Sequence, residues 1–190
     1  DLYAKEVYRY EQVMQDYAAQ ELFYEPLSSN HPLYILFSSG TTGQPKAIVH
    51  SVGGTLIEHL KEFKLHCNAG REDVIFYYTT CAWMMWNWLV SGLTVGATIV
   101  VFDGAPFYPE TISTWRLIDE YQISIYGTSA KFINASAQEG LIPKNELDLG
   151  SLKLILSTGS VLTEEDFDYV YDSVKQDVQL SSISGGTDIV

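Results

Sequence analysis

The feature that most restricts the fold of this chain is a regular alternation of short apolar runs with amphipathic stretches. The apolar runs cover residues 33–37, 47–50, 74–77, 97–102, 123–126, 152–156 and 178–183. Most of them are continuous, which is typical of strands that are buried on both faces of a sheet. We therefore predict an α/β fold in which buried, mainly parallel strands alternate with helices.

Three of the intervening stretches carry apolar residues at helical spacing. Those positions are Leu56, Leu60, Phe63 and Cys67 in the first, Ile112, Trp115, Ile118 and Tyr121 in the second, and Phe167, Val170, Tyr171 and Val174 in the third. The third has the clearest start, because the Thr163 hydroxyl can cap a helix while Asp166 stands three residues later. We predict a helix in each stretch.

Composition excludes several classes of protein. The chain is 46% hydrophobic and 13% aromatic, which supplies enough apolar surface for a packed core. Its net charge of −13, with 11 scattered lysines and arginines, argues against a nucleic-acid partner. Cys67 and Cys81 form no CxxC pair and no HExxH motif occurs. We therefore expect neither a structural zinc site nor a disulfide framework, and we predict a reducing, cytosolic compartment.

One long stretch raises the question of a membrane span. No charged residue occurs from Val74 to Phe102, a length that could cross a bilayer. Polar residues and glycines interrupt it, and Asp73 and Asp103 bracket it without a basic flank. We interpret it as a buried strand, an aromatic helix and a second buried strand.

A run of small and hydroxyl residues after the first apolar run is a candidate phosphate site. It comprises Ser38, Ser39, Gly40, Thr41, Thr42 and Gly43, followed by Pro45 and Lys46. The glycines admit close approach, successive N–H groups and hydroxyls can donate to one anion, and Lys46 adds a positive charge. The run does not match the Walker A pattern, which requires four residues between the glycines. A plain surface turn is the alternative.

The string "FSSGTTGQPKAIVH" resembles the phosphate-loop signature of the adenylate-forming enzymes, the superfamily of acyl-CoA synthetases, luciferases and peptide-synthetase adenylation domains. Ala47 departs from it, because the family usually has glycine there. Three further segments resemble family motifs in the same order: "YGTSAKF" at 126–132, "STGSVLT" at 157–163 and "SISGGTDI" at 182–189. The resemblance runs from about His31 to Val190 and implies part of the large N-terminal domain of such an enzyme.

The resemblance also implies roles for individual residues. The nucleotide would be held by Ser38, Ser39, Gly40, Thr41, Thr42, Gly43 and Lys46, by Gly159, Ser160 and Val161, and by Ser184, Gly185, Gly186 and Thr187. Lys46, Thr187 and Asp188 would be catalytic, and Asp188, which is glutamate in most relatives, would bind Mg²⁺. Trp83, Asn87, Gly127 and Gly185 would line the acyl pocket, while we interpret Trp86 and Trp88 as core residues.

Together with "YYTTCAWMMWNW", these segments are similar to the members of the superfamily that ligate acetoacetate to coenzyme A. In that reaction the carboxylate attacks the α-phosphorus of ATP and releases pyrophosphate, and the thiol of coenzyme A then displaces AMP. The implied partners are acetoacetate, ATP with Mg²⁺ and coenzyme A. The alternatives are an enzyme for another short acid such as acetate, propionate or butyrate, and a non-catalytic ATP-binding module. A serine hydrolase is disfavoured, because no GxSxG elbow is present.

The resemblance further divides the chain. We expect residues 1–32 to form a helical and linker lead-in, and residues 33–190 to form part of the AMP-binding domain. The family's ribose-binding aspartate and its C-terminal domain with a catalytic lysine would be absent. On this interpretation the chain is an internal fragment that is inactive alone.

Overall fold

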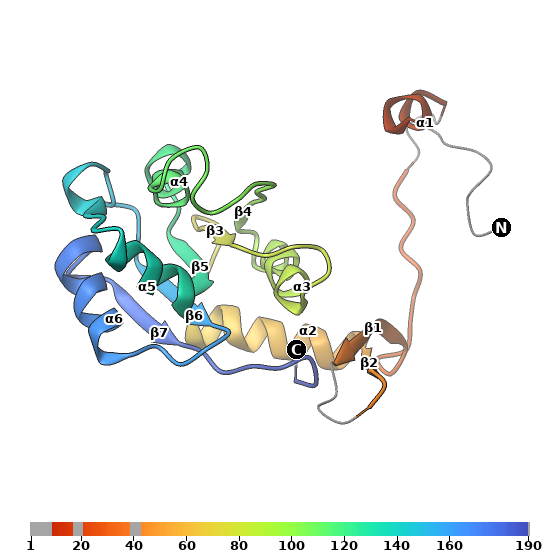
Figure 1. Cartoon of the computed structure of the whole chain (residues 1–190). Coiled ribbons are helices and arrows are strands. Elements are labelled where there is room, and N and C mark those ends of the chain that lie inside the picture. The colour runs from red at the N-terminus through yellow and green to blue at the C-terminus, as the bar shows by residue number, and fades with distance from the viewer. Residues whose placement is uncertain (1–8, 17–20, 39–42, 190) are drawn as a thin grey trace.

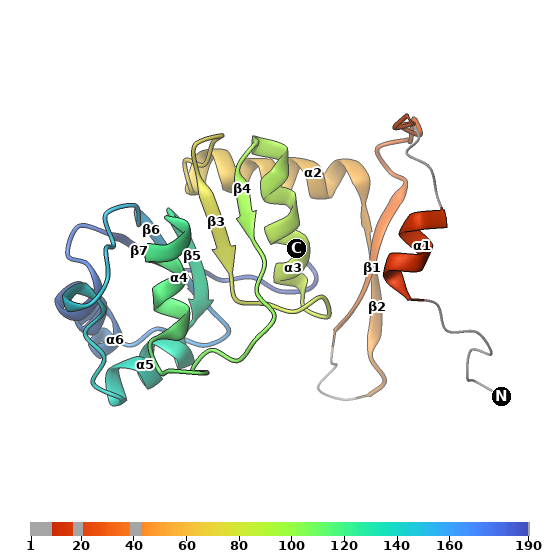
Figure 2. The same ribbon diagram turned by 90° about the horizontal axis from the view of Figure 1, so that it is seen from above.

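The computed structural model describes residues 9–16, 21–38 and 43–189, and its main body is an open parallel sheet between two layers of helices (Figures 1 and 2). The strands are β3 (Val74–Tyr77), β4 (Thr98–Val100), β5 (Ile125–Ser129), β6 (Leu154–Thr158) and β7 (Gln179–Ser182). They lie in the order β4-β3-β5-β6-β7 and every pairing is parallel. The predicted α/β class is confirmed.

Both faces of this sheet are covered, which explains the continuous apolar runs. One face carries Phe76, Tyr126, Ile155 and Leu180. It packs under α4 (Ser113–Tyr121), α5 (Ala130–Gln138), α6 (Glu164–Tyr169) and the π-turn η4 (Val170–Val174). The other face carries Ile75, Tyr77, Ile125, Leu154 and Leu156. It packs against α2 (Val52–Lys61), the π-turn η1 (Glu62–His66), α3 (Met84–Ser91) and the 3₁₀ turn η2 (Gly92–Val95).

The predicted helices are present, and their capping follows the sequence. Thr163 and Asp166 form a reciprocal capping box at the start of α6. Two further short elements are α1 (Tyr10–Asp16) and the 3₁₀ turn η3 (Pro143–Asn145). The buried apolar face predicted for α2 is wrong in one respect. Leu56 is 44% exposed, whereas the polar residues Thr55 and His59 are buried.

The first two strands depart from the prediction. β1 (Pro32–Ser38) and β2 (Lys46–Ser51) form a separate antiparallel pair beside the parallel sheet (Figure 2). Leu33, Ile35 and Phe37 alternate along β1 and are 45%, 61% and 64% exposed. The expectation that the phosphate loop follows a buried strand is therefore wrong, because in the described part of the chain β1 pairs with β2 alone and leaves one apolar face open.

The uncharged stretch 74–102 divides into β3, α3, η2 and β4. Among the residues that the structure describes, no helix has the length and apolar character needed to cross a membrane.

Gly127 in β5 is needed for packing. A β-carbon at this position would lie 2.0 Å from Cδ2 and 2.5 Å from Cγ of Tyr77, whose side chain is 4% exposed. We expect Gly127→Ala to lower the free energy of unfolding by about 3 kcal/mol, because a buried ring fixed at its base cannot move aside. Urea unfolding of the variant and the wild-type protein measures this. Gly70→Ala is the control, since its β-carbon would have no neighbour within 4 Å. Equal losses in the two variants would contradict the prediction.

Candidate functional site

The candidate site lies at the carboxyl edge of the parallel sheet, where ligands of open α/β sheets bind. Thr158 ends β6 and Gly159 follows it, while residues 183–189 follow β7. The loop after β3 leads through Trp83 into α3. Parallel pairing of β3, β5, β6 and β7 thus brings segments distant in sequence to one edge.

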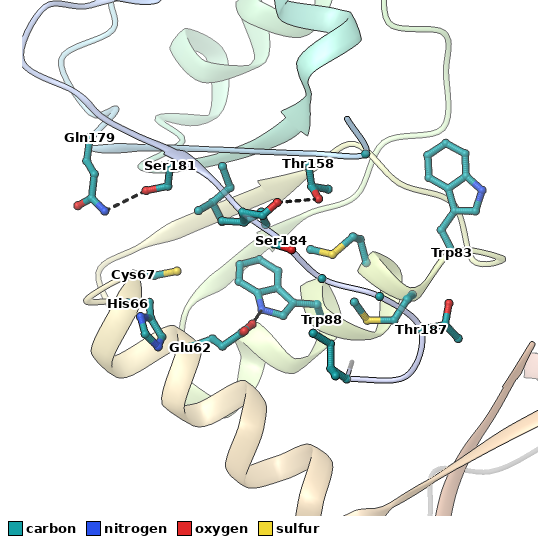
Figure 3. A pocket seen from close by; sticks show the side chains of 18 residues that line it. Glu62, His66, Cys67, Trp83, Trp88, Thr158, Gln179, Ser181, Ser184 and Thr187 are labelled. Atoms are coloured by element: carbon teal, nitrogen blue, oxygen red, sulfur yellow. Dashed lines mark hydrogen bonds between the residues drawn. The ribbon is translucent and has the colours of Figure 1, made fainter. Parts of the chain in front are cut away.

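These segments surround a cavity of about 550 Å³ that extends under the sheet between β6, β7, η1 and α3 (Figure 3). It is lined by Glu62, His66, Cys67, Trp83, Met84, Met85, Trp88, Leu156, Thr158, Gly159, Gln179, Ser181, Ile183, Ser184, Gly185, Gly186, Thr187 and Ile189. Two of the predicted motifs, "STGSVLT" and "SISGGTDI", therefore share one cavity.

Glycines leave space where these two motifs meet. Gly159 has φ +85°, a left-handed conformation that side chains disfavour, and a β-carbon there would have no neighbour within 4 Å. A β-carbon at Gly185 would also meet open space. The Thr158 hydroxyl donates to the carbonyl of Ile183 at 3.1 Å and ties the two segments together. Ser160 and Val161, predicted to contact the nucleotide, are exposed and do not line the cavity.

The β1–β2 hairpin is attached to the same site by one buried side chain. His50 in β2 is 9% exposed, and its Nε2 lies 2.6 Å from the carbonyl oxygen of Thr187. Because the partner is a carbonyl, Nε2 carries the proton and donates. Lys46 begins the same strand, opposite Ser38 in the register, so the predicted phosphate loop connects the two strands of this hairpin. Ser39, Gly40, Thr41 and Thr42 lie outside the described residues, and Gly43 is exposed.

We expect the His50 bond to hold the segment after β7 in place. His50→Phe keeps a ring but removes the donor, so amide exchange in residues 184–188 should become about 5- to 30-fold faster. His50→Gln, whose Nε2 amide can donate from a similar position, should stay close to wild type. Hydrogen–deuterium exchange mass spectrometry measures both.

The control for this experiment is His31→Phe, because within the described residues the His31 ring has a single hydrogen bond, to the carbonyl of its neighbour Pro32. Faster exchange in the His50→Gln variant, equal to that in the His50→Phe variant, would contradict a role for the donor.

Asp188 is exposed at the end of the site. Within residues 9–16, 21–38 and 43–189, no group of three or more His, Cys, Asp or Glu side chains could hold a metal ion. A single exposed carboxylate nevertheless fits Mg²⁺, which proteins often bind through one or two carboxylates together with substrate phosphates.

The acid-binding residues predicted from the sequence are only partly brought together. Gly185 and Trp83 line the cavity, although Trp83 is 56% exposed and stands at its periphery (Figure 3). Asn87 and Gly127 do not line it, and the Tyr77 ring covers Gly127. Four further residues line the cavity that were not assigned to the pocket, namely Met84, Met85, Trp88 and Glu62; Trp88 is 3% exposed, in agreement with its interpretation as a core residue. Helical spacing places Met84, Met85 and Trp88 on one side of α3, and that signal could have identified three of them.

Burial shifts the pKa of two groups at the Cys67 end of the cavity. Burial raises the pKa of Glu62, although a hydrogen bond from Trp88 opposes the shift. Burial, helped by the Glu62 carboxylate, raises the pKa of the Cys67 thiol to about 12. Cys67 is therefore a neutral thiol at physiological pH and not an activated nucleophile.

Similarity to known proteins agrees with this geometry. The acetoacetyl-coenzyme A synthetase of Rhizobium meliloti (strain 1021) is 54% identical over 174 residues, which is 92% of this chain and 27% of the relative. The acetoacetyl-CoA synthetase of Gallus gallus is 51% identical over 90% of this chain and 26% of its own length. A malonamoyl-CoA synthetase of Penicillium aethiopicum is 42% identical over 90% of this chain and 26% of its own length.

A solved structure, that of acetoacetyl-CoA synthetase from Streptomyces lividans, superposes with a TM-score of 0.85. It is 45% identical, and the match covers 90% of this chain and 27% of that one. The chain thus spans about a quarter of the length of the relatives it matches. The sequence profile of the AMP-binding enzyme family matches residues 2–187. The chain belongs to the AMP-binding enzyme family.

Proposed function

We propose that this chain forms the nucleotide- and acid-binding part of an ATP-dependent ligase that activates acetoacetate and transfers it to coenzyme A. The observation that carries the proposal is the convergence of three family motifs on one site. Gly159 and Thr187 line the same cavity, and the His50 bond attaches the strand that begins with Lys46 to Thr187. Relatives named acetoacetyl-CoA synthetase at 51–54% identity support the choice of acid.

In this proposal the first step is catalysed by position and charge. A carboxylate oxygen attacks the α-phosphorus of ATP, the bond to the β-phosphate oxygen breaks, and pyrophosphate leaves with the electron pair. Lys46 attracts the leaving pyrophosphate, and the Thr187 hydroxyl donates to an oxygen of the α-phosphate. Asp188 would hold Mg²⁺, which neutralises phosphate charge when it is bound. In the second step the thiol of coenzyme A displaces AMP from the acyl carbon.

The acidic composition of the chain does not oppose ATP binding. The net charge of −13 is spread over the whole molecule, and salt screens exposed charges beyond about 8–10 Å. Local donors at Lys46 and Thr187 therefore act on the phosphates more strongly than the distant carboxylates.

A cytosolic location is part of the proposal, supported by the free thiols of Cys67 and Cys81.

Malonamate is a second candidate substrate, favoured by the 42% identity to a malonamoyl-CoA synthetase. It has the size of acetoacetate and carries an amide where acetoacetate carries a methyl ketone. The cavity beside Gly185 has room for either acid, so direct comparison has to separate them.

The test measures acid-dependent exchange of pyrophosphate into ATP by the complete gene product that contains these residues. The panel contains acetoacetate, malonamate, acetate, propionate and butyrate. We expect kcat/KM for acetoacetate to exceed that for acetate at least about tenfold, the order of discrimination that one extra carbon supplies. A higher kcat/KM for malonamate than for acetoacetate would identify malonamate as the preferred substrate. Binding of ATP without exchange for any acid would reject the ligase in favour of a non-catalytic nucleotide-binding module.

A further inference from the structure

The indole of Trp88 lines the cavity beneath the sheet between its two ends. Figure 3 shows the ring between Ser184 and Glu62, with Trp83 and Thr187 on one side and His66 and Cys67 on the other. Trp88 is 3% exposed and belongs to the same packed cluster as the sheet residues above it. We call the part of the cavity next to the nucleotide motifs the outer part, and the part beside His66 and Cys67 the inner part.

Aromatic contacts hold the ring in place. The centroid of Trp88 lies 4.3 Å from that of Phe63 and 5.8 Å from that of Tyr77, the latter in an edge-on arrangement. Such pairs stabilise each other beyond the area that they bury. A ring fixed on two sides forms a firmer wall than a methionine, which adapts its shape.

A hydrogen bond fixes the remaining freedom of the ring. Nε1 of Trp88 donates to Oε2 of Glu62 at 2.7 Å, across 26 residues of sequence. Nε1 is the single polar group of the indole, so pairing it sets the rotation of the ring plane. Losing the acceptor would leave a buried donor unpaired and would favour another orientation of the ring.

The cavity as a whole is too large to select a short acid by volume. About 550 Å³ lies in the range that holds drug-sized ligands. Gly185 contributes no side chain to close the outer part. A residue that limits the length of the acid would therefore lie beyond Gly185, and Trp88 is the largest buried side chain of the lining.

We propose that Trp88 is the wall that limits the length of the acid, and that Glu62 is a positioning residue that acts through Trp88. The proposal rests on the proposed function, because it assumes that the outer part of the cavity receives the acid. A four-carbon acid fits between the nucleotide motifs and the indole. Longer acids need the inner part beside Cys67 and reach it only when the indole is removed or released.

The experiment compares acetoacetate with 3-oxohexanoate in the acid-dependent exchange assay on the complete gene product. We expect Trp88→Leu to raise the ratio of kcat/KM for 3-oxohexanoate to that for acetoacetate at least about tenfold, mainly through a lower KM for the longer acid. Trp88→Phe, which keeps a ring against Phe63, should raise it less.

The Glu62 variants distinguish the positioning of the Trp88 indole by Glu62 from a general loss of structure. Glu62→Leu removes the acceptor and should shift the ratio in the same direction as Trp88→Leu. Glu62→Gln keeps an acceptor oxygen and should stay within about twofold of wild type. Trp86→Leu is the matched control on the same helix, because Trp86 does not line the cavity, and its ratio should not move.

The outcomes distinguish the two proposals. Wild-type exchange with an unchanged ratio in Trp88→Leu, Trp88→Phe and Glu62→Leu overturns the wall and leaves the ligase intact. An equal shift in Trp86→Leu also overturns it. If Trp88→Leu does not fold, Trp88→Phe and Glu62→Leu decide the question by the same ratio. Absence of exchange with every acid in the wild-type protein rejects the ligase and, with it, the wall.

Discussion

Replacing Lys46 with alanine is expected to slow acid-dependent ATP–pyrophosphate exchange about 100- to 1,000-fold. This is the typical loss when one group that stabilises charge in a transition state is removed. Lys46 is exposed at the start of β2 and makes no ion pair with any residue that the structure describes. Its charge is therefore free to act on a phosphate, and its loss should leave the thermal midpoint of unfolding unchanged.

A conservative variant and a control variant accompany Lys46→Ala. Lys46→Arg keeps the charge but alters its geometry, so it should retain part of the activity. Lys131→Ala on α5 removes another exposed lysine without an ion pair in the described part of the chain, and it should retain full exchange. Wild-type exchange rates in the Lys46→Ala protein would refute a role in the release of pyrophosphate.

Gly185→Trp is expected to lower kcat/KM for acetoacetate by about 100-fold or more while lowering that for acetate much less. Gly185 lines the cavity and a β-carbon there would have no neighbour within 4 Å, so we expect an indole at this position to occupy part of the cavity without a clash at its base. The indole would occupy the volume that the larger acid needs. Each carbon that no longer fits lowers kcat/KM by a factor of about 10 to 200. Exchange kinetics with both acids provide the measurement.

Gly185→Ala is the companion to this variant. Its methyl group has no neighbour within 4 Å and should change neither acid by more than about twofold. If the Gly185→Trp protein discriminates between the acids as the wild type does, the acid does not bind beside residue 185.

Periodicity predicted most of the fold because the fold is built from elements that bury apolar side chains. Continuous apolar runs placed all the strands of the parallel sheet, and Trp115 and Ile118 on α4 are buried as their spacing indicated. The same rule failed at β1, since an apolar run does not reveal whether one face will stay open. It also failed at His59, which is buried and paired with Ser91 Oγ at 2.8 Å, because polar contacts between helices leave no trace in hydrophobic spacing.

The position of the cavity was predictable to the extent that it depends on local sequence motifs. The motifs around Gly159 and Gly185 have a recognisable chain order, and the parallel sheet brings their ends to one cavity. The pairing of Glu62 with Trp88 was not predictable, because it depends on how η1 faces α3 in three dimensions. Asn87 illustrates the same limit, since it stands on α3 but does not line the cavity.

The contact between His50 and Thr187 joins positions separated by 137 residues. Contacts of such high sequence separation pay the entropy of closing a long loop, so they tend to form late in folding. Breaking this contact would leave every strand pair of the parallel sheet intact, because the hairpin is a separate sheet. Nucleotide that contacts both segments would bind only the fully assembled chain, and through mass action it would slow turnover by proteases that attack the open form.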